Sequence, residues 1–195
     1  MKQRRLLILL AIFAAVLLNN GLQFLQEHVL DWPFYFDSVF TIVMGIFFGW
    51  VPGVITGLLT NLLIEVIDGF QGLTWPFAIV NMATGLIAGL LAADKKRYWT
   101  LPGQVAMILA LTAANALLGA FIVNFVYGGL TGNAPDILVT ALLLMGRGKA
   151  LSTILARVPI NLVDKGTPVI IIYMIHRFTN FRTRRNEDPL RGVED

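Results

Sequence analysis

The stretch SVFTIVMGIFFGWVPGVITGLLTNLLIEVI (residues 38–67) decides the fold of this chain. It is apolar over nearly its whole length and is broken once, at Val51, Pro52 and Gly53, where proline and glycine favour a tight reversal. Crossing the hydrocarbon core of a bilayer takes about 20 helical residues, and fewer where the bilayer thins. The stretch therefore predicts a hairpin of two short membrane helices, 38–50 and 54–67.

The composition agrees with a membrane protein. Of the 195 residues, 56% are hydrophobic and 14% charged, and the mean hydropathy is +0.72, which leaves too little polar material to coat a soluble globule of this size. Outward from the hairpin, apolar runs predict further helices at 6–24, 77–93, 104–127 and 159–177. We therefore expect an all-α integral membrane protein of one domain (1–195) with six transmembrane helices.

The segment 136–158 does not fit a simple span. It is apolar at its start but carries Arg147, Lys149 and Arg157. These features predict an amphipathic segment at the membrane surface before the last helix, and a re-entrant or seventh crossing is the alternative. The polar tail, 179–195, is expected to be disordered.

Basic residues orient the helices, because cytoplasmic loops carry an excess of Lys and Arg. With both termini in the cytoplasm, three inner segments are basic: the N-terminus, the loop at 95–97 and the tail from Arg177. The first two outer loops contain acids and no Lys or Arg. This arrangement predicts a multi-pass protein with both termini inside, and leaves Arg147, Lys149 and Arg157 outside, where they either bind a ligand or contact lipid headgroups.

Strong polar side chains within the predicted helices concentrate toward the outer ends. For example, Asn61 and Glu65 share one helix face at i, i+4. A charge at membrane depth costs about 2.5 to 3.5 kcal/mol even on the gentler insertion scale, so such residues need partners, water or a ligand. The candidate substrate-binding residues are Asn61, Glu65, Trp75, Phe77, Asn81, Asn124, Arg147, Lys149, Arg157, Asn161, Asp164 and Lys165.

The alternative is that these residues only join helices through hydrogen bonds worth roughly 0.6 to 2 kcal/mol each. For a single amide such as Asn115 this structural role is the better interpretation. For the whole set we favour a ligand pocket, because purely structural polar residues should be spread over all depths. Substrate identity does not follow from the sequence.

Aromatic residues crowd the first outer loop, 31–37, where Trp32, Phe34, Tyr35 and Phe36 are candidates for a lid over a flat organic ligand. An interfacial aromatic belt explains them equally well. The chain has no cysteine, and its two histidines fall on opposite sides of the membrane in this topology. We expect no metal and no cofactor.

Small residues four positions apart predict close helix packing. The pairs are Gly45 and Gly49, Gly53 and Gly57, Gly85 and Gly89, and Ala11 and Ala15. The predicted first helix has no polar residue at depth, so we expect it to contribute nothing to the pocket and to leave a smooth face free for a partner.

These features together resemble the substrate-binding S components of energy-coupling-factor (ECF) vitamin transporters, over approximately residues 5–178. The resemblance rests on the six predicted helices, the inside termini, and Ala11 and Ala15, which match the family's Ala-x-x-x-Ala motif. It rests also on Gly49-Trp50-Val51-Pro52-Gly53 and on Pro76-Phe77-Ala78-Ile79-Val80-Asn81 leading to Gly85 and Gly89.

The resemblance implies a small-molecule site in the outer half, closed by the loop between the first two helices and the loop between the fifth and sixth. It implies docking of the first helix, through Ala11 and Ala15, on a membrane scaffold subunit driven by two cytoplasmic ATPases. It also implies the plasma membrane of a prokaryote. Besides these subunits and the bilayer, the expected partner is the substrate, and no nucleic acid is expected.

The expected function is therefore high-affinity uptake of a small organic micronutrient, a vitamin or vitamin precursor. Outer cations would suit a carboxylate or phosphate on it. The chain should not be an enzyme itself, because it lacks a Gly-x-x-x-x-Gly-Lys-[Ser/Thr] phosphate loop. An alternative is a ligand-sensing membrane module that signals to a separate kinase. A membrane lipid-modifying enzyme comes third, because its clustered acids or histidines are missing.

Overall fold

In the computed structural model, the described residues are 2–30, 34–72, 74–132 and 135–187, without the side chains of Glu27 and 180–187. They form helices and no strand. The helices are α1 (Lys2–Leu25), extended by a π-helical turn (Gln26–Leu30), α2 (Val39–Phe48), α3 (Trp50–Ile67), a 3-10 turn (Trp75–Phe77), α4 (Ala78–Leu91), α5 (Lys95–Tyr98), α6 (Leu101–Phe125), α7 (Asp136–Leu144) and α8 (Lys149–Glu187).

Within the described part of the chain, four helical segments are long and apolar enough to cross a membrane: Lys2–Leu30, Trp50–Ile67, Leu101–Phe125 and Lys149–Thr179. Two shorter apolar helical segments, Val39–Phe48 and Trp75–Leu91, pack among them. The prediction of an all-α membrane protein is confirmed. Whether the two short segments also span the bilayer stays a prediction.

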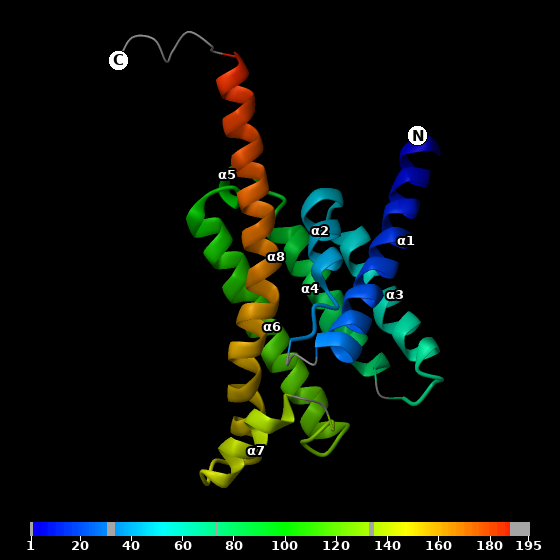
Figure 1. Ribbon diagram of the computed structural model, residues 1–195, viewed down its shortest axis with the longest axis vertical. Helices are drawn as coiled ribbons and strands as arrows, with labels where there is room; N and C mark the ends of the chain where they lie inside the picture. The colour runs from blue at the N-terminus through cyan, green and yellow to red at the C-terminus, as the bar shows by residue number, and fades with distance from the viewer. Residues whose placement is uncertain (1, 31–33, 73, 133–134, 188–195) are drawn as a thin grey trace.

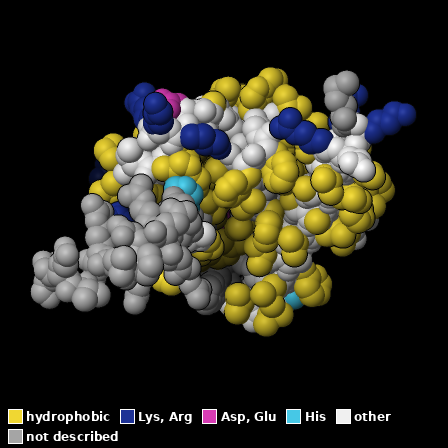
Figure 2. All heavy atoms as spheres, turned by 90° about the horizontal axis from the view of Figure 1, so that it is seen from above, with side chains coloured by type: hydrophobic (Ala, Val, Ile, Leu, Met, Phe, Trp, Pro, Cys, Tyr) yellow, Lys and Arg dark blue, Asp and Glu magenta, His cyan; other side chains and the backbone are white. Residues whose placement is uncertain are grey.

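The helices form two neighbouring groups (Figure 1). Helices α1 to α4 pack on one another, and α6 packs on both α4 and α8. The first turns of α1, the last turns of α8 and the short α5 lie at one end of the molecule, while α7 lies at the opposite end. Figure 2, seen from the end with α5, shows Lys and Arg side chains around that end and hydrophobic side chains over much of the surface.

Glycines bring α3 and α4 into backbone contact. A Cβ added to Gly85 would collide with the backbone of Gly53, and one added to Gly57 would collide with the backbone at Asn81. Helix α2 joins the same interface, where a Cβ on Gly45 would lie 2.8 Å from the carbonyl oxygen of Gly85. The close packing predicted from the glycine spacings is confirmed for these residues.

The turn of the α2–α3 hairpin lies at Gly49, not at residues 51–53 as predicted. Gly49 has φ +99°, a backbone conformation that glycine adopts at little steric cost. Pro52 lies in the first turn of α3, where its missing N–H would have no helical partner anyway. The sequence position of a proline therefore marked the start of a helix and not the break itself.

The last helix is longer than predicted. Helix α8 begins at Lys149, so residues 149–158 form its first turns and do not lie on the membrane surface as a separate segment. Only 136–144 remains a distinct short helix. Asn124 on α6 donates a hydrogen bond of 2.6 Å to Thr153, which fixes this early part of α8 against α6.

The C-terminal end of α8 also departs from expectation. The helix continues to Glu187, whereas we expected disorder from residue 179. The remaining tail residues lie outside the described part of the chain.

Helix α1 is not the featureless helix that we expected. Asn19 is fully buried and donates hydrogen bonds to Thr41 Oγ1 (3.0 Å) and Thr60 Oγ1 (3.1 Å), so that it joins α1 to α2 and α3. Ala15 is only 4% exposed and packs in one cluster with Met44, against which the half-buried Ala11 also lies. The small-residue face of α1 thus points into the molecule, where it lets α1 approach α2 and α3. It is therefore not free for a partner.

Candidate ligand-binding site

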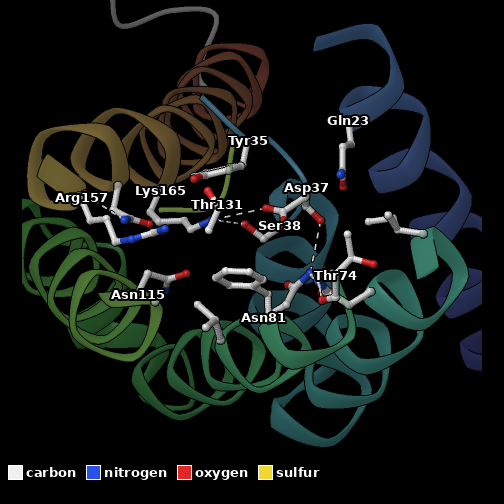
Figure 3. A pocket seen from close by; sticks show the side chains of 16 residues that line it. Gln23, Tyr35, Asp37, Ser38, Thr74, Asn81, Asn115, Thr131, Arg157 and Lys165 are labelled. Carbon is white, nitrogen blue, oxygen red and sulfur yellow. Dashed lines mark hydrogen bonds and ion pairs between the residues drawn. The ribbon is translucent and has the colours of Figure 1, made fainter. Parts of the chain in front are cut away.

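A cavity of about 100 Å³ lies among α3, α4, α6, α8 and the segment before α2 (Figure 3). Since a single water needs roughly 10 to 15 Å³, the space can hold a small organic molecule or part of one. The side chains around it carry many amide, hydroxyl and charged groups, on a base of apolar ones. Such a mixture is typical of small-molecule sites.

The structure brings together about half of the residues that the sequence nominated. From the substrate-binding set, the cavity is lined by Asn61, Phe77, Asn81, Arg157, Asn161 and Lys165, and Tyr35 lines it from the candidate lid. These residues come from segments far apart in the chain. Their binding role stays a prediction, but their convergence on one space is an observation.

Glu65 and Trp75 do not line this cavity. The Glu65 carboxylate instead accepts hydrogen bonds from the backbone N–H of Thr74 (2.8 Å) and Trp75 (3.0 Å), from the Thr74 hydroxyl (2.6 Å) and from the N–H of Gly72. The Trp75 side chain is 55% exposed. Glu65 therefore fixes the connection between α3 and α4, and its buried charge is stabilised by that connection.

Three further nominated residues lie elsewhere. Asn124 bonds the Ala120 carbonyl (2.8 Å) and Thr153, which is an interhelical role. Arg147 and Lys149 are exposed around the start of α8. Because α8 begins at Lys149, Arg147 and Lys149 are well removed along the chain from Arg157 and do not share its environment.

Lys165 is surrounded by oxygen atoms. Its Nζ lies 2.6 Å from Asp164 Oδ2 and 3.6 Å from Asp37 Oδ1, and it donates a hydrogen bond to the Ser38 hydroxyl. The other oxygen of Asp164 accepts a hydrogen bond of 2.8 Å from the backbone N–H of Phe36. Asp164 and Lys165 thus fasten the segment 36–38 to α8.

Of the three candidate lid residues that the structure describes, Tyr35 lines the cavity and Phe34 and Phe36 do not. Phe34 and Phe36 contact each other, with ring centroids 6.1 Å apart, and Trp32 lies outside the described residues. Burial raises the pKa of the Tyr35 phenol, although Arg157 beside it acts in the opposite direction. Burial also raises the pKa of Asp37, against the effect of Lys165.

Arg157 has a different environment from Lys165. The residue is only 4% exposed, and its guanidinium carbon lies 5.8 Å from the centre of the Phe77 ring. Its Nε has no hydrogen-bond partner, and no carboxylate of the described residues forms an ion pair with it. Gly119 on α6 makes room for the guanidinium, since an added Cβ there would lie 3.2 Å from it.

Amide side chains line the part of the cavity that lies between α3, α4 and α6. Asn81 donates to Asn61 Oδ1 (3.0 Å) and to the Asp37 carbonyl (3.4 Å), while its own Oδ1 has no partner. Asn115 donates to Thr84 Oγ1 (2.9 Å), as its predicted structural role requires, and nevertheless lines the cavity. The cavity wall therefore offers both hydrogen-bond donors and acceptors.

Sequence reasoning missed the apolar lining residues Ile64, Val80 and Gly119. It also missed the polar lining residues Gln23, Asp37, Ser38, Thr74, Thr131 and, because we assigned it to helix packing, Asn115. Gln23 lies four residues after Asn19, and this i, i+4 polar pair could have revealed a polar outer face on α1. No pattern pointed to Thr131. Among the described residues, no group of three or more His, Cys, Asp or Glu side chains could hold a metal ion.

A family model described as 5TMR of 5TMR-LYT matches residues 1–145. The match covers well over half of the chain, so the chain belongs to this family of membrane domains of sensory type. No curated protein and no solved structure matches the chain. Helix α8, which carries Arg157, Asn161 and Lys165, lies beyond the matched residues.

Proposed function

We propose that this member of the 5TMR of 5TMR-LYT family captures a small organic molecule in its cavity and serves as the substrate-binding subunit of an ECF-type importer. The observation that supports ligand capture is the set of buried polar groups around one cavity, among which Arg157 Nε and Asn81 Oδ1 have no protein partner. Buried polar groups are almost always satisfied, and at membrane depth unsatisfied ones are expensive.

The segment 35–38 is the proposed route of entry. It borders the cavity and is fastened to α8 by the Phe36–Asp164 and Ser38–Lys165 hydrogen bonds and by the Asp37–Lys165 ion pair. The Asn81–Asp37 hydrogen bond joins it to α4. Only a few polar contacts would have to break for it to move, so a molecule arriving from the end opposite the termini can be admitted and then covered. We expect the substrate to be a micronutrient, namely a vitamin or vitamin precursor. We expect the protein to lie in the plasma membrane of a prokaryote.

The chain itself is proposed to hydrolyse nothing. In this proposal ATP is hydrolysed by two cytoplasmic ATPase subunits that act through a membrane scaffold subunit. Docking through Ala11 and Ala15 does not fit the half-buried position of Ala11 and the buried position of Ala15. A scaffold that contacts α1 would instead meet its exposed side chains, such as Leu10, Phe13 and Leu17.

Sensing is the second candidate, because the family match is to a membrane domain of sensory type. In this case the same cavity binds the same molecule, and a separate kinase responds to the change at the segment 35–38. The two functions share ligand capture and differ in the partner.

Affinity purification of the tagged chain from its native membranes tests the proposal. Importer function predicts that a membrane scaffold and two ATPases accompany the chain, and that deleting the gene abolishes uptake of the molecule that it binds. Co-purification of a kinase with unchanged uptake would replace the importer by the sensor. Absence of any bound molecule would contradict both.

A further inference from the structure

We propose that Arg157 is the receptor for an anionic group, a carboxylate or a phosphate, on the molecule that occupies the cavity. This inference rests on the proposed ligand-binding function and specifies the chemical class of its ligand. It divides the cations nominated from the sequence into one that binds the ligand and others that do not.

Arg157 is a buried charged residue that lines the cavity without a counter-charge among the described residues. It is 4% exposed, lines the cavity, and has a free Nε, and no carboxylate of the described residues forms an ion pair with it. A buried charge is tolerated when it is paired, so the missing partner is expected to come from outside the chain. The planar guanidinium suits the two oxygens of a carboxylate or phosphate.

The surroundings hold the guanidinium in place for such a group. Phe77 lies beneath it at 5.8 Å, and Gly119 leaves space beside it on α6. Figure 3 shows Arg157 and Lys165 on the α8 side of the cavity, with Asn115 and Asn81 across from them. A bound anion at the guanidinium would thus lie within reach of these amide side chains.

Lys165 is not an equivalent receptor. Its ammonium group already contacts Asp164 at 2.6 Å, Asp37 at 3.6 Å and the Ser38 hydroxyl. All three donors of an ammonium group can be used by these oxygens. Arg147 and Lys149 are exposed and away from the cavity lining, so neither takes part.

The summed formal charge of Arg157, Lys165, Asp37 and Asp164 does not disfavour the binding of an anion. Arg157 and Lys165 balance Asp37 and Asp164 in number, but both acids gather at Lys165. Asp37 and Asp164 both lie beside the Lys165 ammonium group, whereas neither forms an ion pair with Arg157. Of the two cations that line the cavity, Arg157 is therefore the one without a carboxylate partner among the described residues.

Thermal unfolding of the purified full-length protein in neutral detergent tests the proposal with formate, acetate and inorganic phosphate as probes. Each is compared with chloride at constant ionic strength, and intrinsic tryptophan fluorescence reports unfolding. We expect at least one probe to raise the unfolding temperature of the wild type saturably. In Arg157→Gln we expect its apparent affinity to fall at least about tenfold.

Arg147→Gln is the matched control, because it removes the same charge from an exposed position, and it should respond like the wild type. In chloride alone, Arg157→Gln should unfold at the same or a higher temperature than the wild type, since a buried unpaired charge has been removed. A purely structural arginine predicts the opposite shift. A wild type that no probe stabilises, or an Arg157→Gln variant that keeps the response, would overturn the proposal.

Two additional arms identify the source of the anion. Stabilisation by phosphatidylglycerol micelles but by none of the soluble probes would assign Arg157 to a lipid headgroup and overturn a soluble ligand. Mass spectrometry of the molecule bound to the wild type separates this inference from the function itself. A neutral bound molecule would contradict the role of Arg157 and leave ligand capture standing.

Discussion

Arg157 and Lys165 lie on the same helix and line the same cavity, yet their surroundings differ. Lys165 contacts two carboxylates, whereas Arg157 has none among the described residues. The sequence could predict that both are polar residues near the outer end, because that depends on local spacing. It could not predict which cation is paired, because Asp37 and Phe36 reach α8 only through the tertiary fold.

Asp37 provides a test of these pairings through the pH dependence of stability. Burial raises its pKa in the folded protein, against the effect of Lys165 and with that of Asp164. The stabilisation from the bound proton is therefore fully present below the ordinary carboxyl pKa, about 3.9, and is lost as pH rises through the higher folded-state pKa. We expect the unfolding temperature of the wild type to fall relative to Asp37→Asn as pH increases from about 4.

The measurement is thermal unfolding of both proteins across this pH range in the same detergent. Parallel profiles for the two proteins, or a wild type that gains stability over Asp37→Asn with rising pH, would show that burial does not govern this carboxyl.

At the scale of helices, the spacing of residues predicted which helix faces pack together better than it predicted where each helix begins and ends. The glycines of α3 and α4 meet as their four-residue spacing indicates, because which residues share a helix face is a local property. Helix boundaries predicted from the prolines were wrong, since Pro52 lies in the first turn of α3 and Pro159 lies inside α8. Whether a proline ends a helix depends on neighbouring helices, which the sequence alone does not supply.

The α3–α4 interface predicts a strong effect of adding one methyl group. Gly85→Ala should lower the free energy of unfolding by about 1 to 3 kcal/mol, because its Cβ would collide with the backbone of Gly53 and force the helices apart. Gly21→Ala on α1 is the matched control, since nothing lies within 4 Å of an added Cβ there. It should be neutral or stabilising by up to roughly 1 kcal/mol.

Equilibrium unfolding in detergent mixtures measures both variants. Equal stability of Gly85→Ala and the wild type would mean that the two backbones are not in contact in the protein.

At the scale of the whole molecule, the polar cavity and the basic end are separated along the helices. The start of α1, the last turns of α8, and α5 with its Lys95, Lys96 and Arg97 share one end (Figure 1). The concentration of polar residues toward the other end was predictable from their positions within the apolar runs. We did not predict the contribution of α1, although the i, i+4 spacing of Asn19 and Gln23 marks a polar face near the C-terminal end of this helix. That this face turns toward the other helices follows from packing.

The proposed orientation can be measured because the chain contains no cysteine. A single cysteine in place of Met145, which is 75% exposed at the α7 end, should react with a membrane-impermeant maleimide in intact cells. A cysteine in place of Lys96 should react only after permeabilisation. The reversed pattern would place the cavity on the cytoplasmic side and exclude capture of an external substrate.

The central claim is that the cavity holds a small molecule, and mass spectrometry of the molecule released from purified protein tests it most directly. The three proteins to compare are the wild type, Gly119→Leu, which places a side chain in the cavity beside Arg157, and Leu117→Phe, an exposed position on the same helix. Size-exclusion chromatography verifies that each is folded. We predict one molecule at near-equal ratio to protein in the wild type and Leu117→Phe, and a strongly reduced amount in Gly119→Leu. Equal amounts in all three proteins, or none in the wild type, would contradict the account.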